Sequence, residues 1–465
     1  MKSKEPFLML LRWLAMFLAP VWMTGFIASH TTAEQLNILH IHLDDLRADG
    51  LHSLGTEVLV TPNLDRLVQR GVSFTRCYTM GSMIGAVCTP SRTMLLTGRS
   101  WQRIPGARNA LPDADDPKTF LPKILEAAGY QTWHMGKPGN SFAPGIAAFE
   151  TNIKDGGDGK DPESNRELAS RRLADQSITF LKSRQASGEM RPFYMYLAPQ
   201  VPHDPRIAEP HFHSMYSPEK IPLPKAFLPL HPFDNGEMTV RDEKLAPWPR
   251  TPEDTRQQLA DYYACISCLD HHVGRIFDEL RALDQWDKTL IVFSSDNGLS
   301  MGEHGLFGKQ NLYEFGGMHV PLVIAGPGIS PGESRALVYL MDLYPTLAEY
   351  AGATVPQGVE GQSLRGILEG RHTKTREWLY TGYRDCMRSI RDDRWKLIRY
   401  PLVDRTQLFD LDADPREQND LSNRPEYATK LEEMMSALER EMKSFRDDHP
   451  LHVSDPKPSE WNPPQ

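Results

Sequence analysis

The feature that most constrains the fold is the alternation of short, apolar, β-prone runs with amphipathic helical segments. The run LNILHIHLDD at 36–45 precedes TPNLDRLVQRG at 61–71, which has proline at the first helical position and glycine at its end. A helix, a glycine and a strand follow one another again at 119–137. Further apolar runs lie at 192–205, 288–298 and 320–328. This order predicts an α/β fold with a large, mostly parallel sheet sandwiched by helices.

Polar side chains stand where these predicted strands end. They are Asp44 and Asp45, Lys137, His203, and Asp296 and Asn297. In parallel sheets the ligand site lies beyond the carboxyl ends of the strands, so we expect these side chains to meet. Carboxylate and amide oxygens are the ligands that Ca²⁺ and Mg²⁺ prefer. Each acidic pair taken alone also fits ordinary turn chemistry, because Asp, Asn and Gly favour turns.

Two segments of the chain differ in composition from these strands and helices. Residues 205–256 are rich in proline and polar residues and are expected to form a long surface excursion over the site. From about Arg371 the pattern favours short antiparallel strands and a final helix. We therefore predict a catalytic α/β domain at 34–370 and a smaller C-terminal α+β domain with an antiparallel sheet at 371–465. The tail from 455 has the composition of a disordered segment.

The first residues have the pattern of an export signal. Lys2 and Lys4 precede a short apolar stretch and the small-residue run ASHTTAEQ. We predict a signal peptide at 1–33 and an exported protein, periplasmic or secreted, with an uncleaved anchor as the alternative. No later segment has the length and apolarity of a membrane span, so none is expected after cleavage. The formal net charge of −9 disfavours nucleic acid as a partner.

One of five cysteines has unusual neighbours. Cys88 lies in GAVCTPSRTMLLTGR, just ahead of an apolar run with helical character. A cysteine at a helix N-terminus is surrounded by free backbone N–H groups that favour an anion, and Arg92 lies one turn further on. The pattern predicts a site for a tetrahedral oxyanion. The alternative is a buried, inert cysteine beside a helix-starting proline.

The motif CTPSRTMLLTGR resembles the signature of the type I sulfatases, the formylglycine-dependent, arylsulfatase-like enzymes of the alkaline phosphatase superfamily. The blocks DDLRAD, TPNLDRL, SSDNGLSMGEHGLFGKQNLYE, VPLVIAGPG and RSIRDDRWKLIRY resemble further family blocks in the family order. The resemblance covers nearly the whole chain after the predicted signal. The excursion resembles that of bacterial branches that act on sulfated polysaccharides.

The resemblance implies a modified nucleophile and one metal ion. A maturation enzyme would oxidise Cys88 to formylglycine, whose hydrate attacks sulfur with one hydroxyl and releases sulfate through the other. One Ca²⁺ ion, with Mg²⁺ as the alternative, would be bound by Asp44, Asp45, Asp296, Asn297 and residue 88.

The same resemblance assigns four further residues. Arg92 would hold and polarise the nucleophile, while Lys137 and Lys309 would bind the sulfate oxygens and offset their charge. His203 would protonate the leaving oxygen, a task that suits a side chain with an ordinary pKa near neutrality. The plainer alternatives are a solvated loop lysine at 309, a strand-end lysine at 137 and a turn histidine at 203.

The chain departs from the family pattern after Lys137. Where the family has Gly-Lys-Trp-His, this sequence has GKPGN, so Pro138 and Gly139 replace tryptophan and histidine. The resemblance implies that the missing histidine helps the hydrate to release sulfate. The candidates to replace it are Asn140, Ser141 and His134.

The leading hypothesis is an exported, calcium-dependent sulfuric-ester hydrolase that acts on a sulfated carbohydrate. The alternatives are a phosphonate monoester or phosphodiester hydrolase of the same superfamily, and a degenerate, non-catalytic binder of sulfated glycans. A two-zinc phosphatase fits less well, because the only histidines near the acidic pairs are His40 and His42, inside the predicted strand. Trp101, Arg103 and Arg108 are further candidates for substrate contact.

Overall fold

A computed structural model of the chain describes residues 35–103, 116–137, 139–155 and 167–464. The predicted signal peptide and Arg108 lie outside these residues. An eight-stranded sheet has the order β11-β2-β10-β8-β1-β7-β5-β6. Its strands are β1 (Asn37–Leu43), β2 (Val72–Phe74), β5 (Gln131–Gly136), β6 (Thr151–Lys154), β7 (Phe193–Ala198), β8 (Thr289–Ser295), β10 (Leu322–Ala325) and β11 (Gly332–Ser334). The run β8-β1-β7-β5-β6 is parallel throughout, and β10 is antiparallel to both of its neighbours.

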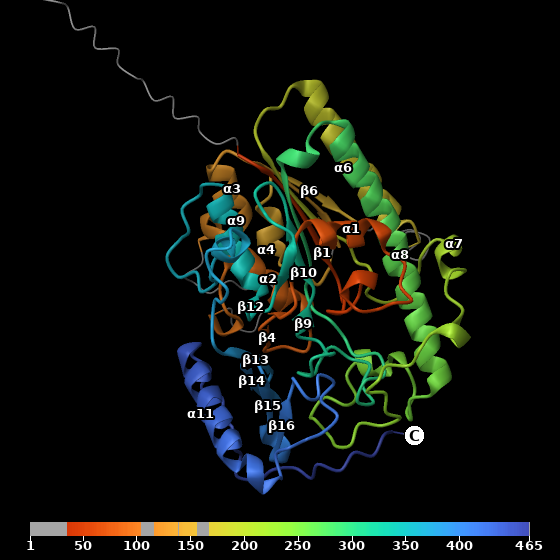
Figure 1. Cartoon of the computed structure of the whole chain (residues 1–465), viewed down its shortest axis with the longest axis vertical. Coiled ribbons are helices and arrows are strands. Elements are labelled where there is room, and N and C mark those ends of the chain that lie inside the picture. The colour runs from red at the N-terminus through yellow and green to blue at the C-terminus, as the bar shows by residue number, and fades with distance from the viewer. Residues whose placement is uncertain (1–34, 104–115, 138, 156–166, 465) are drawn as a thin grey trace, which may run out of the picture. The chain divides into compact units, whose positions relative to one another are not determined.

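Helices cover both faces of this sheet (Figure 1). The helices of the described chain are α1 (Pro62–Arg70), α2 (Cys88–Thr97), α3 (Leu121–Ala127), α4 (Ala143–Ala147), α6 (Ala169–Ser187), α7 (Pro210–His213), α8 (Pro252–Ala282), α9 (Leu343–Tyr350), α10 (Arg365–Leu368) and α11 (Ala428–Ser444), and the last of these packs on another sheet. One face packs against α1, α6 and α8, and the other against α2, α3 and α9. All seven residues of β1 are buried, as expected of a central parallel strand covered on both faces. The predicted fold class is confirmed.

The long helix α8 starts where the sequence carries helix-start signals. Thr251 is its N-cap and accepts a hydrogen bond through Oγ1 from Asp254 N at 3.0 Å, with Pro252 at the first helical position. Cys265 and Cys268 lie inside this helix. All five cysteines are free and buried, so their spacing carries no disulfide.

A five-stranded sheet lies in the C-terminal part of the chain, in the order β16-β15-β14-β13-β4. Its strands are β4 (Gly81–Ser82), β13 (Leu379–Tyr383), β14 (Met387–Arg391), β15 (Trp395–Tyr400) and β16 (Arg405–Asp410), and α11 packs on β13, β14 and β15 (Figure 1). The strands β13 to β16 form an antiparallel meander, while β4 pairs with β13 in parallel. The sequence did not predict that the segment leading to Cys88 would add a strand to this sheet. A small third sheet contains β3 (Cys77–Tyr78), β9 (His319–Val320) and β12 (Val338–Tyr339).

A buried ionic cluster joins this second sheet to the main part of the fold. Glu314, which follows the Lys309 loop, accepts hydrogen bonds from Tyr78 Oη at 2.5 Å and Arg391 Nη1 at 2.8 Å. Lys396 Nζ on β15 lies 2.9 Å from Glu314 Oε1 and 2.8 Å from Glu417 Oε1. We refer to these five residues as the Glu314 cluster.

The C-terminal tail differs from our expectation of disorder. Lys457 N donates to Leu402 O, Asp234 N donates to Ser459 O, both at 2.8 Å, and Trp461 packs against the hydrophobic core. Composition does not reveal such pairing, because the partners lie far away in the chain. Within the described ranges, no helix combines the length and apolarity needed to cross a membrane.

Candidate active site

Helix α2 places Cys88 at the centre of a buried polar cluster. Cys88 is the first residue of the helix and is 1% exposed. The helix ends at Gly98, whose φ of 69° is left-handed and whose N–H donates to Met94 O at 2.8 Å. The free backbone N–H groups of the first turn therefore lie beside the side chain of residue 88, as the sequence predicted.

Two aspartates at the end of β1 lie next to this thiol. Cys88 Sγ is 3.3 Å from Asp44 Oδ1 and 3.9 Å from Asp45 Oδ1. Asp45 has a left-handed φ of 67°, and Tyr262 Oη on α8 donates to its carbonyl oxygen at 2.8 Å. A non-glycine residue in this conformation needs fixed surroundings, so Tyr262 helps to hold the turn that aims both carboxylates at Cys88.

The residues after β8 complete the acidic side of the site. Asp296 Oδ1 accepts a hydrogen bond from Asp45 N at 3.2 Å, and Asn297 Nδ2 donates to Asp45 Oδ1 at 2.6 Å. Strands β1 and β8 are parallel and paired along their length, which brings these two strand ends together. Asp44, Asp45 and Asp296 are called the site carboxylates below.

Three cations oppose the site carboxylates. Arg92 Nε donates to Asp296 Oδ2 at 2.8 Å, Lys137 Nζ contacts Asp44, and Lys309 Nζ lies 2.8 Å from Asp45 Oδ1. Lys309 Nζ is also 3.3 Å from Cys88 Sγ. These three, the site cations, are all buried.

The electrostatics of the centre follow from burial and close pairing. Burial alone would raise the pKa of Asp44, but the positive charge of Lys137, with those of His203 and Arg92, holds this pKa well below its ordinary value. Burial and then the carboxylates of Asp296 and Asp44 raise the pKa of the Cys88 thiol well above its ordinary value. The surroundings described here therefore do not favour a thiolate at residue 88.

The donor set fits a hard divalent cation. Ligand atoms of Asp44, Asp45, Cys88 and His203 lie within 4.8 Å of one another. Among the described residues, Asn297 Oδ1 is a buried oxygen that accepts no hydrogen bond. An oxygen left in this state is costly unless something else binds it, and a cation among oxygen ligands would do so.

His203 lies at the rim of the site. Its Nε2 is 3.8 Å from Asp45 Oδ2, and its Nδ1 lies 2.7 Å from Asp204 O, which orients the ring. The excursion contributes Asp242, whose Oδ2 is 3.9 Å from Lys309 Nζ and accepts a hydrogen bond from Gln310 Nε2 at 2.7 Å.

The structure brings all nine predicted site residues together. The sequence analysis missed Tyr262 and Asp242: the spacing of α8 indicated only a core position for Tyr262, and no motif surrounds Asp242. Trp101 and Arg103 are not part of this cluster. Trp101 is 3% exposed, and Arg103 Nε pairs with Glu360 Oε1 at 2.9 Å.

A cavity of 430 Å³ adjoins Lys137 where the family histidine is missing. Its lining includes Thr89, His134, Lys137, Gly139, Asn140 and Ser141. His134 Nδ1 is 2.9 Å from Asn152 Oδ1, and burial lowers the pKa of His134 to about 4, so its ring is neutral near pH 7. A Cβ atom added at Gly139 would have no other heavy atom within 4 Å.

Known protein families and proteins match this chain over most of its length. The sulfatase family model matches residues 36–353, and the model described as N-sulphoglucosamine sulphohydrolase, C-terminal, matches residues 302–445. A similar relative is the N-acetylglucosamine-6-O-sulfatase of Bacteroides thetaiotaomicron, 26% identical, with 89% of this chain and 87% of the relative covered. The choline-sulfatase of Rhizobium meliloti is 28% identical, with 85% and 84% covered.

The solved structures show the same fold. A protein in complex with its substrate D-glucosamine-2-N,6-O-disulfate has a TM-score of 0.73 at 24% identity, with 90% of this chain and 99% of that chain covered. The phosphonate monoester hydrolase of Silicibacter pomeroyi has a TM-score of 0.70 at 23% identity, with 89% and 96% covered. The chain belongs to the sulfatase family. It is a sulfuric ester hydrolase.

Proposed function

We propose that this sulfatase releases sulfate from a sulfated carbohydrate, using calcium and a formylglycine made from Cys88. The observation that carries the proposal is the position of Cys88 Sγ, 3.3 Å from both Asp44 Oδ1 and Lys309 Nζ at a helix N-terminus. Burying a charge costs free energy unless it is paired, and an inert core thiol gains nothing from buried charges of either sign. The charges around Cys88 therefore indicate a reactive site. The hydrate of formylglycine would supply two hydroxyl groups, one to attack sulfur and one to release sulfate.

The charge balance of the site supports an anionic substrate. The three site carboxylates are matched by the three site cations. Ca²⁺ bound to the carboxylates and Asn297 would leave the centre with a net charge of plus two and would polarise the nucleophile as a Lewis acid. A centre of this charge attracts a sulfate ester and stabilises the negative charge that develops on its oxygens.

The protein's own groups then have separate roles. Arg92, fixed by Asp296, orients the side chain of residue 88. Lys137, which follows β5, and Lys309, in the loop after β8, hold the sulfate oxygens. His203 at the rim protonates the oxygen that leaves, and the carbonyl of Asp204 at 2.7 Å keeps its ring in place.

The carbohydrate substrate is supported by the relatives. The Bacteroides thetaiotaomicron relative is named an N-acetylglucosamine-6-O-sulfatase. Parallel assays of aryl sulfate, sulfated saccharides, an aryl phosphodiester and a phosphonate monoester test the proposal. Faster turnover of the phosphorus esters would show instead a phosphonate or phosphodiester hydrolase, and binding of sulfated saccharides without turnover would show a degenerate binder.

We expect calcium to stabilise the protein and Asp296→Asn to weaken this effect. Free calcium at about 100 times its Kd adds about 2.7 kcal/mol to the unfolding free energy. Loss of one ligand charge should raise the Kd at least about tenfold, because ligand charge count sets calcium affinity. Thermal unfolding across a calcium titration, repeated with magnesium, measures both effects. Asp278→Asn, at an exposed carboxylate on α8, is the control and should titrate like the wild type. Identical melting with millimolar calcium and with chelator would contradict the metal site.

We expect Gly139→His to increase turnover. A Cβ atom at residue 139 would have no other heavy atom within 4 Å, and residues 137 and 139 line the same cavity, so there is room for a side chain to enter beside Lys137. A well-placed general base contributes about 10²–10⁴-fold, and we expect at least about tenfold in kcat. Gly139→Ala is the control for the loss of backbone freedom. If the histidine variant is no faster than the alanine variant, another group already carries out this step.

A further inference from the structure

A second pocket lies beside the path of the chain that leads to Cys88. It has a volume of 630 Å³, and its walls include Met83, Trp101, Gln102, Arg384, Arg446 and His449. These residues come from the loop before α2, the segment after α2, the turn between β13 and β14, and the segment after α11. The pocket is therefore built from both the main part of the fold and the C-terminal sheet.

Hydrogen bonds connect the wall of this pocket to the loop that precedes Cys88. Arg384 N donates to Ser82 O at 2.7 Å, and Tyr383 Oη donates to Gly85 O at 3.1 Å. Gly85 O also lies 3.3 Å from Nε2 of Gln310, the residue after Lys309. The loop from Ser82 to Val87 thus lines the pocket with Met83 near one end and is followed directly by Cys88 at the other.

Two residues that line the pocket have buried polar atoms without partners. Among the described residues, Trp101 Nε1 and both Gln102 Nε2 and Oε1 are buried and make no hydrogen bond. Buried groups of this kind are costly, and a turn of the half-buried Gln102 side chain toward the pocket would let a ligand with hydroxyl groups satisfy its amide. The ring of Trp101 is held from one side by Arg388, whose guanidinium carbon is 5.6 Å from the ring centroid.

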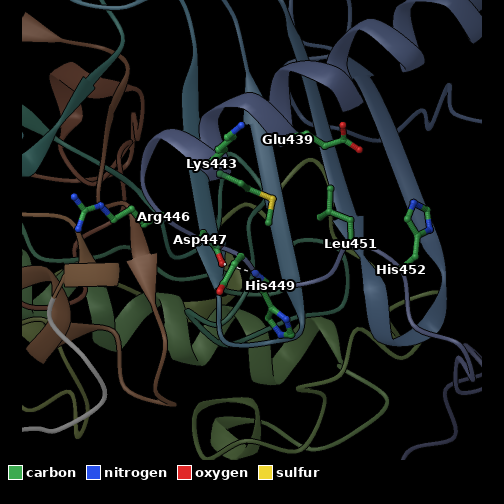
Figure 2. A pocket seen from close by; sticks show the side chains of 9 residues that line it. Glu439, Lys443, Arg446, Asp447, His449, Leu451 and His452 are labelled. Carbon is green, nitrogen blue, oxygen red and sulfur yellow. Dashed lines mark hydrogen bonds between the residues drawn. The ribbon is translucent and has the colours of Figure 1, made fainter.

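The rim carries charges of both signs. Arg446 is exposed and forms no ion pair within the described part of the chain, whereas Arg388 Nε pairs with Asp447 Oδ2 at 2.6 Å. Figure 2 shows an adjoining pocket beside α11, in which the guanidinium of Arg446 points away from Leu451 and His452. Asp385 and Asp448 also line the 630 Å³ pocket. Alternating donors and acceptors suit hydroxyl groups, while the carboxylates disfavour a polyanion.

We propose that this pocket binds an uncharged, hydroxyl-bearing saccharide unit of the substrate, next to the unit whose sulfate enters the reaction centre. Arg446 and Gln102 are its specificity-determining residues. The inference rests on the proposed function, because it assigns to that reaction a substrate larger than a single sulfated group.

The test compares a large and a small substrate. The large substrate is the sulfated oligosaccharide that the wild type hydrolyses best in a panel. We expect Arg446→Ala and Gln102→Leu each to raise the KM for this substrate about tenfold, because each variant loses one hydrogen bond to a charged or buried group. Both should stay within about twofold of the wild type on 4-nitrophenyl sulfate, which reaches only the centre. Arg440→Ala, at an exposed arginine on α11 that does not line the pocket, is the matched control.

Each result decides the proposal. Equal losses on both substrates, unchanged KM on the oligosaccharide, or a wild type that prefers 4-nitrophenyl sulfate to every oligosaccharide would overturn it. A preference for oligosaccharides that carry sulfate on the neighbouring unit would overturn the uncharged character of the ligand. If no sulfate ester is hydrolysed, the proposed function fails, and calorimetry with desulfated oligosaccharides still decides the pocket: binding lost in Arg446→Ala supports it, and no binding refutes it.

Discussion

Cys88→Ala should abolish sulfate release, with a loss in kcat of about 10⁵-fold or more, the size seen when a covalent nucleophile is removed. The Sγ atom of residue 88 lies 3.3 Å from Asp44 Oδ1 and from Lys309 Nζ. The other described side chains of the site are carboxylates, cations, an amide and an imidazole, and none of them can replace residue 88 as the nucleophile that attacks sulfur. The folded state should survive, because alanine keeps the helix start and removes only one buried sulfur.

Cys77→Ala is the matched control for this experiment. Cys77 is another fully buried, free cysteine, but it lies in β3, away from the site. We expect a cost of about 1 kcal/mol in stability and unchanged turnover. Mass analysis of the peptide that contains residue 88, taken from active enzyme, should show oxygen in place of sulfur and two hydrogens fewer than cysteine. An unmodified thiol in fully active enzyme would refute the proposed nucleophile.

The strand ends were predictable because their signal is local. An apolar run followed by Asp44 and Asp45, and another followed by Asp296 and Asn297, indicates both the strands and the edge at which they meet. The position of Cys88 at a helix start follows from the proline two residues later. The family resemblance added Lys309 and the proposed roles of Lys137 and His203.

Other parts of the site depend on contacts that no local pattern encodes. Tyr262 lies in a helical core pattern, and only the fold brings its hydroxyl to the carbonyl of Asp45. Asp242 begins a short 3-10 helix, Asp242–Leu245, in the proline-rich excursion, and β4 is two residues long. Both elements are too short to be recognised by periodicity. The open space at Gly139 is likewise a property of the packed molecule and not of the sequence.

The C-terminal region shows how such contacts bear on domain organisation. The boundary near Arg371 stays a prediction, but the sheet beyond it includes β4 from the segment before Cys88. The Glu314 cluster adds buried charges contributed from both sides of that boundary. The two regions therefore share hydrogen bonds and ion pairs that neither satisfies alone, and we expect them to unfold together.

Lys396→Met should destabilise the protein by about 3–5 kcal/mol at pH 8, because it leaves the buried carboxylate of Glu417 without its cation, whereas Glu314 keeps Arg391. Lys396 Nζ is 2.9 Å from Glu314 Oε1 and 2.8 Å from Glu417 Oε1, and its side chain is 3% exposed. Burial raises the pKa of Glu417 to about 7 even with Lys396 present, and loss of the lysine raises it further. Urea unfolding at several pH values measures the effect.

The pH dependence separates this explanation from a simple packing defect. A folded-state pKa above the unfolded one means that the native state binds the extra proton, so the stability of the variant falls as pH rises through this window. The loss should therefore be smaller at pH 5, where Glu417 is protonated, and the added change Glu417→Gln should recover much of it at pH 8. Lys374→Met breaks an exposed ion pair with Asp393 and should cost less than about 1 kcal/mol. A loss that is equal at both pH values and unaffected by Glu417→Gln would show that Lys396 contributes through the packing of its methylene groups and not through its charge.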